Sequence, residues 1–443
     1  MKRIVLPVLF TFLVTLTFGQ DLKKATSYTN DKKYEKAKTE IDGILAKDPN
    51  NTEALYLKSK VYSAMADSAA YKSLFTGDPH AEAFEAFKKA IADSNNPKIT
   101  LMVVKDNYQP IFGIYAGYYG EAANAFNDAA TSNNKPDTAG FAKAMDLFIK
   151  ANEVGQYISQ NKWATIGKVD TTLVLNIAKA ALNAKKDDIA SKYFKEIADA
   201  HIKGLHNAAD SADPNFELPY QWLTLNYKQA GDSANMVKYA EIGKQLFPKD
   251  DYFDLVQMDY YREKENHPSL FKIYEELITR NPDSLRYHLN YATEIFSYLY
   301  NSDEGVVISN KEELLNTLKS QLDKAVAIEP NNSSVNLLYA QYYYNQGIVT
   351  MEEASKIKGA KLTPEQQKKK TDLNSAGQNY LKQAIPYAEK AMTTLEEGYK
   401  KAEKSRYKSV VNLLQNIYQS IGDQAKLKFY QEKYDQADAK FVG

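Results

Sequence analysis

Four prolines lie in short segments of similar sequence along this chain, and their spacing limits what the chain can fold into. Pro248 and Pro282 lie 34 residues apart, and each follows an apolar-periodic segment. Pro49 and Pro330 lie in the similar segments AKDPNN and AIEPNN. A fixed period in the thirties is typical of a stack of similar small units, each burying its apolar face only against its neighbours. The spacing therefore predicts a repeat array rather than a domain with one central core.

Positions counted from these prolines carry matching residue types. Ten residues beyond each proline the side chain is small or slender, and thirteen residues beyond it the side chain is large. The first set is Ser59, Met258, Ala292 and Ala340, and the second is Tyr62, Tyr261, Ile295 and Tyr343. Apolar residues follow helical spacing, and no run alternates as a strand would. We therefore expect an all-α fold of paired helices, with tyrosines filling the space that the small residues leave.

Counted from the prolines in this way, the repeating pattern divides the chain into about nine helix pairs. Proline ends the second helix of a pair because it lacks an N–H group and its ring clashes with the preceding turn. We expect N-terminal units over 21–155, of which 98–155 is irregular, then a connector over 156–170 and a C-terminal array over 171–443.

Three insertions interrupt the C-terminal array, at 205–216, 299–312 and 349–378. The last is polar and rich in lysine, and its charge run is interpreted as a solvated helix face. Because Thr363 precedes Pro364 as at a capped helix start, this insertion is expected to lengthen a helical hairpin beyond the stack.

The first 20 residues are predicted to be a secretory signal peptide. Lys2 and Arg3 precede an apolar run over 4–18, and cleavage is expected near Gly19 or Gln20. The run is short for a membrane span of about 20 residues, although an uncleaved anchor is the alternative. The chain has no cysteine, which excludes disulfides and a cysteine-linked lipid. A periplasmic or secreted protein without a membrane span in its mature chain is expected.

At the level of whole units, the chain resembles the tetratricopeptide repeat (TPR) family. The segment 227–248 matches the family's repeat over its length. It has an aromatic residue at the end of the first helix, a glycine in the turn, small residues in the second helix and a proline after it: Tyr227, Gly231, Ala240, Gly243 and Pro248. The segments 28–49 and 260–282 repeat much of this pattern. The resemblance implies a right-handed superhelical solenoid of antiparallel helix pairs with a concave groove. The short, phenylalanine-containing signal is similar to those of exported Bacteroidota proteins.

Nothing in the sequence selects a catalytic, metal or cofactor site. Basic and acidic residues balance at 56 each, without the basic stripe of a nucleic-acid binder. The five histidines form no metal-binding pair and are interpreted as surface or packing residues: His80, His201, His206, His267 and His288. Phosphate-binding and nucleophile motifs are absent. A glycosidase carboxylate pair stays open in principle, but no two residues stand out. We expect a protein that is not an enzyme.

The resemblance implies binding of a peptide or helix of a partner protein along the first helix of each pair. The residues expected to face such a partner are Gln221, Lys228, Asp259, Arg262, Thr293, Gln341, Tyr344 and Asn345. Their mixture of polar and aromatic groups suits adaptable recognition. It does not match the clamp with which some TPR relatives hold a terminal carboxylate. The first hypothesis is an exported adaptor for an envelope or secretion-related protein.

A second hypothesis, from another class, is glycan binding by tyrosine-rich surfaces. The chain has 33 tyrosines, and two clusters are candidates for this role: Tyr115, Tyr118 and Tyr119, and Tyr342 to Tyr344. Helical-repeat nutrient-binding proteins of Bacteroidota are partial relatives, but they usually carry a lipid on a cysteine that this chain lacks.

Overall fold

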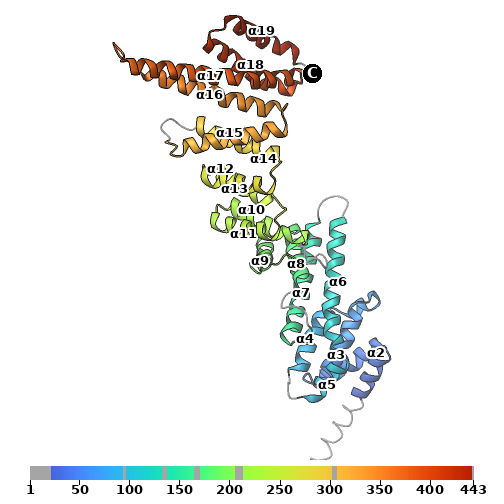
Figure 1. The fold of residues 1–443 in the computed structure, drawn as a ribbon. Helices are drawn as coiled ribbons and strands as arrows, with labels where there is room; N and C mark the ends of the chain where they lie inside the picture. Colours follow the sequence, from blue (N-terminus) through green and yellow to red (C-terminus); the bar gives the residue numbers. More distant parts are fainter. Residues whose placement is uncertain are drawn as a thin grey trace, which may run out of the picture. The chain divides into compact units, whose positions relative to one another are not determined.

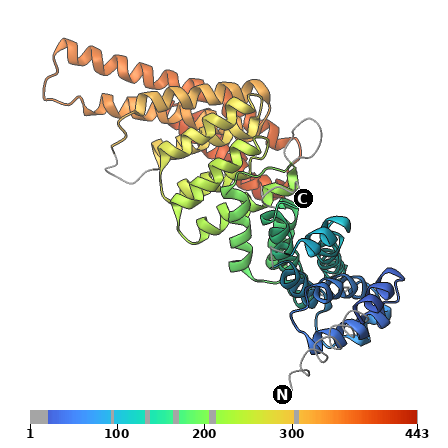
Figure 2. The ribbon, with the colours of Figure 1, turned by 90° about the horizontal axis from the view of Figure 1, so that it is seen from below.

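The computed structural model describes residues 21–92, 96–131, 137–163, 170–204, 213–301 and 307–441. In these ranges every regular element is a helix. The chain forms two compact units, Met1–Val256 and Gln257–Gly443. Within each unit, helices that follow one another in sequence lie side by side (Figure 1, Figure 2).

The first unit begins with a helical stretch over 21–30. Its longer helices are α2 (Tyr34–Lys47), α3 (Thr52–Ala66), α4 (Pro79–Ile91), α5 (Pro97–Lys105), α6 (Gln109–Thr131), α7 (Thr138–Gln160), α8 (Thr171–Asn183), α9 (Asp187–Asp199), α10 (Glu217–Gln229) and α11 (Ser233–Leu246). Two short 3-10 helices, η1 (Ala69–Leu74) and η2 (Pro214–Phe216), stand in the connections.

The second unit takes in most of α12 (Tyr252–Glu263), which crosses the boundary between the units. Its other helices are α13 (His267–Arg280), α14 (Leu285–Tyr300), α15 (Lys311–Ile328), α16 (Ser333–Lys356), α17 (Pro364–Glu396), the 3-10 turn η3 (Lys401–Glu403), α18 (Lys404–Ile421) and α19 (Gln424–Lys440).

Successive helices pack as antiparallel pairs, and each pair packs on the next. The first unit has the pairs α3/α4, α6/α7, α8/α9 and α10/α11, and the second has α14/α15, α16/α17 and α18/α19. Contacts of α7 with α8 and of α9 with α10 join the pairs of the first unit, and those of α15 with α16 and of α17 with α18 join the pairs of the second. The expected fold class, a solenoid of antiparallel helix pairs, is confirmed.

The repeated prolines mark the ends of helices. The helices α2, α11, α13 and α15 end at Lys47, Leu246, Arg280 and Ile328, two residues before Pro49, Pro248, Pro282 and Pro330. The offset has a steric cause, because the proline ring also disfavours helical backbone at the residue before it. The prolines therefore follow helix ends, as predicted, and α11 and α15 are the second helices of their pairs.

The positions counted from the prolines are core positions, with one exception. Ser59, Ala292 and Ala340 are fully buried, and Tyr62 and Ile295 are buried beside them. Tyr261 was expected to be buried in the same way, but it is only partly buried. Its ring meets the edge of Tyr260 at 5.5 Å between centroids.

Most of the region expected to be irregular is instead a pair of long helices, although the short helix α5 and two left-handed residues, Asn107 and Tyr108, precede that pair. Both α6 and α7 have 23 residues, and they pack along each other. The glycines that suggested irregularity permit close approach: a Cβ at Gly113 would lie 3.0 Å from the Ser63 hydroxyl, and one at Gly117 would lie 2.3 Å from the His80 ring. The predicted connector also begins too early, because α7 continues to Gln160.

The tyrosine excess has a structural use that repeats along the stack. Buried or half-buried rings place their hydroxyls at the helix surface, where each donates to a carboxylate on another element. These pairs are Tyr56–Asp106, Tyr62–Asp42, Tyr118–Asp78, Tyr239–Asp199, Tyr291–Glu275, Tyr339–Asp323, Tyr407–Glu396 and Tyr430–Glu389. The pKa of these hydroxyls is raised above the ordinary value near 10. Burial is the larger cause, and the neighbouring carboxylate is the smaller one.

The insertion over 349–378 lengthens the α16/α17 hairpin into an arm (Figure 2). Thr363 begins α17 with a capping box that it shares with Gln366. The two helices cross closely at Gly347 and Gly377, where a Cβ at either position would lie 3.0 Å from the carbonyl oxygen of the other.

Candidate partner-binding surface

The eight residues predicted to face a partner lie on four helices, and none of them is buried. Gln221 and Lys228 lie on α10, Asp259 and Arg262 on α12, Thr293 on α14, and Gln341, Tyr344 and Asn345 on α16. The two on α10 belong to the first unit, and the other six belong to the second. In the first unit, the Gln221 side chain donates to the Asp250 carboxylate at 2.7 Å, which holds it against the turn that follows α11.

An ion-pair network joins α12 to α14. Arg262 is 45% exposed, and its Nε donates to Oε1 of Glu294 at 2.9 Å. Its Nη1 donates to Oδ1 of Asp259 at 2.9 Å. Thr293, next to Glu294, is exposed and donates its hydroxyl to the Leu289 carbonyl. The Arg262 charge is therefore compensated within the unit by two carboxylates, so a partner would meet a paired cluster with one excess negative charge rather than a free cation.

A second link joins α14 to α16. The Gln346 side chain donates to the Tyr300 hydroxyl at 2.7 Å, and burial raises the pKa of Tyr300 to about 12. With the Arg262–Glu294 pair, this link places three helices, α12, α14 and α16, next to one another. We call the six predicted residues on these three helices, all of them unburied, the A-helix surface: Asp259, Arg262, Thr293, Gln341, Tyr344 and Asn345.

The tyrosines of the glycan hypothesis are mostly part of the packing. Tyr342 and Tyr343 are 8% and 9% exposed, and Tyr118 is buried against His80. Tyr115 donates its hydroxyl to Asp170 at 2.6 Å, and its ring stacks on Tyr119. Sugar binding on aromatic rings requires an open ring face. Of these tyrosines, Tyr344 keeps a partly open ring without a ring partner among the described residues.

Two of the described histidines are packed among other side chains. His288 is buried, with one ring nitrogen 2.7 Å from Gln321 Oε1 and the other 2.8 Å from the Pro282 carbonyl oxygen. His267 stacks on Tyr298 at 4.0 Å, and burial lowers its pKa. His206 lies outside the described residues. No cluster of three or more metal-ligating side chains occurs in the part of the chain that the structure describes.

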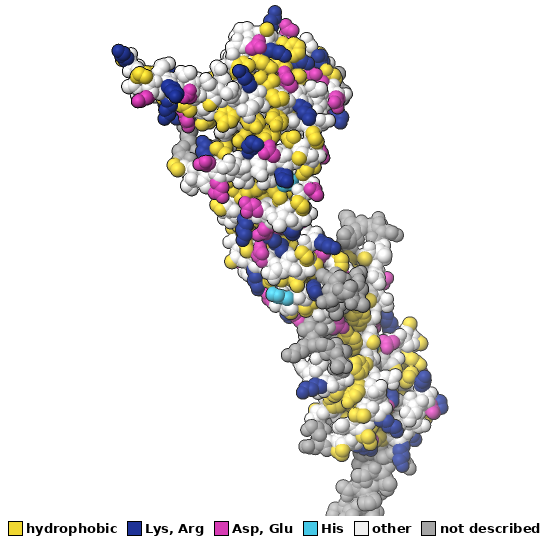
Figure 3. All heavy atoms as spheres, in the orientation of Figure 1, with side chains coloured by type: hydrophobic (Ala, Val, Ile, Leu, Met, Phe, Trp, Pro, Cys, Tyr) yellow, Lys and Arg dark blue, Asp and Glu magenta, His cyan; other side chains and the backbone are white. Residues whose placement is uncertain are grey.

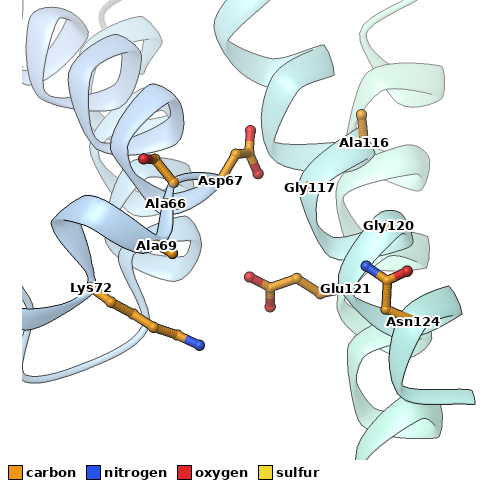
Figure 4. Close-up of a pocket in the computed structure, with 10 residues that line it drawn as sticks. Ala66, Asp67, Ala69, Lys72, Ala116, Gly117, Gly120, Glu121 and Asn124 are labelled. Atoms are coloured by element: carbon orange, nitrogen blue, oxygen red, sulfur yellow. The ribbon is translucent and has the colours of Figure 1, made fainter. Parts of the chain in front are cut away.

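Two hollows lie elsewhere in the described residues, at positions that the sequence patterns did not indicate. One, of about 430 Å³, opens between the end of α3 with η1 and the middle of α6 (Figure 4). A second, of about 450 Å³, lies beside it and shares Asp67 as a lining residue. Neither is lined by any of the eight predicted residues. The spacing of Gly113, Gly117 and Gly120 on one helix was the available sign of an open face.

Among the described helices, none combines the length and apolar character that a membrane crossing needs. The space-filling view shows charges of both signs interspersed over the visible face (Figure 3).

Comparison with known sequences returned no matching family model and no matching curated protein. Among solved structures, PilW, a type IV pilus biogenesis factor, is 16% identical with a TM-score of 0.25, over 60% of this chain and 95% of that chain. The TPR domain of P58(IPK) is 11% identical with a TM-score of 0.25, over 96% and 99%. Yeast Tom70 is 12% identical with a TM-score of 0.22, over 94% and 87%.

Proposed function

We propose that this chain is an exported, non-enzymatic adaptor that holds a peptide or helix of an envelope or secretion-related protein on its A-helix surface. The observation that carries the proposal is that α12, α14 and α16 lie side by side, with the six side chains of the A-helix surface unburied on them. A row of this kind can follow an extended or helical ligand over several units.

The chemistry of this surface favours a protein ligand over a charged polymer. Arg262 is held by Asp259 and Glu294 and presents no free cation, while Gln341 and Asn345 offer amide donors and acceptors. Tyr344 adds a partly open ring, and burial raises the pKa of its hydroxyl. Side chains of these types make adaptable hydrogen bonds and aromatic contacts, which are common in protein interfaces.

Recovery of a partner from an envelope extract of the native host tests the adaptor proposal. We expect a protein to bind the full chain stably, and Tyr344→Ala to weaken that binding at least five-fold. Tyr434, a half-buried tyrosine on α19, provides the matched control, and Tyr434→Ala should bind as the natural chain does. Retention of polysaccharide without protein, or equal binding by both variants, would overturn the proposal.

Export is a separate part of the proposal and rests on the first 20 residues. Intact-mass measurement on protein from the native host should give a chain that begins at Gln20 or Asp21. A mass that includes Met1 to Gly19 would show that the segment is retained and would favour the anchor.

A further inference from the structure

We infer that the hollow between α3, η1 and α6 is a binding site for a cationic side chain, lysine or arginine, presented by a peptide or protein ligand. This site is separate from the A-helix surface and lies wholly in the first unit. We call it the Asp67 cleft, after the residue that the two neighbouring hollows share.

The walls of the Asp67 cleft bring two carboxylates together from different elements. Asp67 follows the last turn of α3, and Glu121 projects from α6 on the opposite wall (Figure 4). Lys72 of η1 reaches toward the same space from the rim. Among the described residues, neither Glu121 nor Lys72 has an ion-pair partner. Two carboxylates and one ammonium leave the cleft with an excess negative charge that a ligand cation would balance.

The end of α3 adds to this preference. The 15-residue helix ends at Ala66, and both Ala66 and Asp67 line the cleft. The carbonyl groups in the last turn of a helix carry partial negative charge, so a cation is favoured there and an anion is disfavoured. Helix end and carboxylates therefore select the same sign of ligand charge.

A buried histidine lies directly behind this wall. His80 is 1% exposed, and its Nε2 lies 3.3 Å from Oδ1 of Asp67 without hydrogen-bond alignment. Neither ring nitrogen has a hydrogen-bond partner, and the ring faces Gly117, which lines the cleft. Buried polar atoms in native proteins are nearly always satisfied. Because His80 lines neither hollow, a cation bound in the cleft would act on this unsatisfied imidazole through Asp67 rather than by direct contact.

The floor of the cleft is open enough for a ligand chain. Ala116, Gly117 and Gly120 form it, and a Cβ at Gly120 would meet no atom within 4 Å. The second hollow, shared at Asp67, continues along Ser63 and Gly113. Residues that flank the bound cation therefore have room on that side, which favours a peptide over a free amine.

Gly120 also allows a clean blocking variant. Gly120→Leu would place its side chain in the open space of the cleft, and leucine favours a helix interior over glycine. Gly43 in α2 is a matched control, because it is also a helix-interior glycine with nothing within 4 Å of a Cβ. Gly43→Leu adds the same side chain away from the cleft.

The test measures fluorescence anisotropy of two peptide pools on the full chain. Both contain capped nonapeptides with random alanine, serine and leucine flanks, with arginine or lysine at the centre of one pool and norleucine at the centre of the other. We expect the cationic pool to bind at least ten-fold more tightly, and Gly120→Leu to abolish this difference while Gly43→Leu preserves it. Glu121→Gln, an exposed change that cannot disturb packing, should weaken the cationic pool at least five-fold. Tyr344→Ala should leave it unchanged.

Equal binding of the two pools, or binding of neither, would overturn the inference. Unaltered preference in Glu121→Gln would do so as well, even if Gly120→Leu failed to fold. Because Tyr344 is far from this cleft in the sequence and absent from its lining, the adaptor proposal can fail or hold independently.

Discussion

Among single residues, tyrosine has a role in this fold that phenylalanine could not take, because it combines an apolar ring with a hydrogen-bonding hydroxyl. In a thin stack, a ring that packs between helices also reaches the surface. Its hydroxyl can then donate to a carboxylate on another helix, as Tyr430 of α19 does to Glu389 of α17 at 2.7 Å. The ring contributes apolar burial, and the hydroxyl bond determines which helix lies opposite.

This role predicts a measurable loss on removal of one hydroxyl. Tyr430→Phe should lower the free energy of unfolding by about 1–2 kcal/mol, because the partly buried Glu389 carboxylate loses a hydrogen bond. Urea unfolding followed by circular dichroism measures the change. Tyr344→Phe is the control, since no hydrogen bond of its hydroxyl occurs among the described residues, and it should shift the midpoint negligibly. Equal effects of the two changes would contradict the role assigned to the carboxylate bond.

The residues of the Asp67 cleft were beyond sequence reasoning. Asp67 stands in an Asp-Ser pair that is typical of turns, and His80 lies in no ligand motif. Their relation depends on α4 and α6 meeting beside the end of α3, and local sequence patterns do not specify that contact. In contrast, Ser59 and Ala340 were predictable as core residues because the proline period places them in register.

At the scale of elements, helix ends were easier to predict than helix continuity. Proline and capping residues act locally, so the ends of α11 and α13 and the start of α17 follow from the sequence. The helix α6 did not, because its glycines lower helix propensity and suggest a break. Packing of α6 against α3 and α4 outweighs that propensity, and the same glycines make the close approach possible.

The close crossing of α16 and α17 in the arm can be tested by a substitution at Gly377. In Gly377→Val the new side chain would meet Met351 Cγ, 2.4 Å from the Cβ position, and the backbone oxygen of Gly347 at 3.0 Å. The backbone contact cannot move aside without separating α16 from α17, so we expect a loss of about 1–3 kcal/mol, as is usual for overpacking. Thermal unfolding of the variant measures it.

Gly43→Val is the matched control for this change. It adds the same side chain to a helix interior where nothing lies within 4 Å, so its midpoint should not fall. If Gly377→Val unfolded at the same temperature as Gly43→Val, the close crossing of the two helices would be disproved.

At the scale of the whole molecule, stability is distributed over many similar contacts rather than concentrated in one core. The tyrosine–carboxylate bonds recur from α3 to α19, so a condition that affects tyrosine acts on every part of the stack at once. Alkaline pH is such a condition.

The sign of the alkaline effect follows from the raised pKa values. Burial raises the pKa of Tyr274, Tyr342 and Tyr418 to about 12, whereas an unfolded tyrosine titrates near 10. Below pH 10 the hydroxyls are neutral in both states, and their contribution to stability is fully present. Between pH 10 and 12 the unfolded chain loses protons first, so stability falls. Unfolding midpoints and phenolate absorbance from pH 8 to 12 measure this, and tyrosines that titrate near 10 without loss of helix would contradict it.

The proposed function places a partner protein against α16 at Tyr344. Site-specific photo-crosslinking tests it most directly, with p-benzoylphenylalanine placed at position 344 or, for comparison, at position 434 of the full chain in its native host. We predict one discrete protein adduct from position 344 that is absent from position 434. No adduct at position 344, or the same adducts from both positions, would contradict the account.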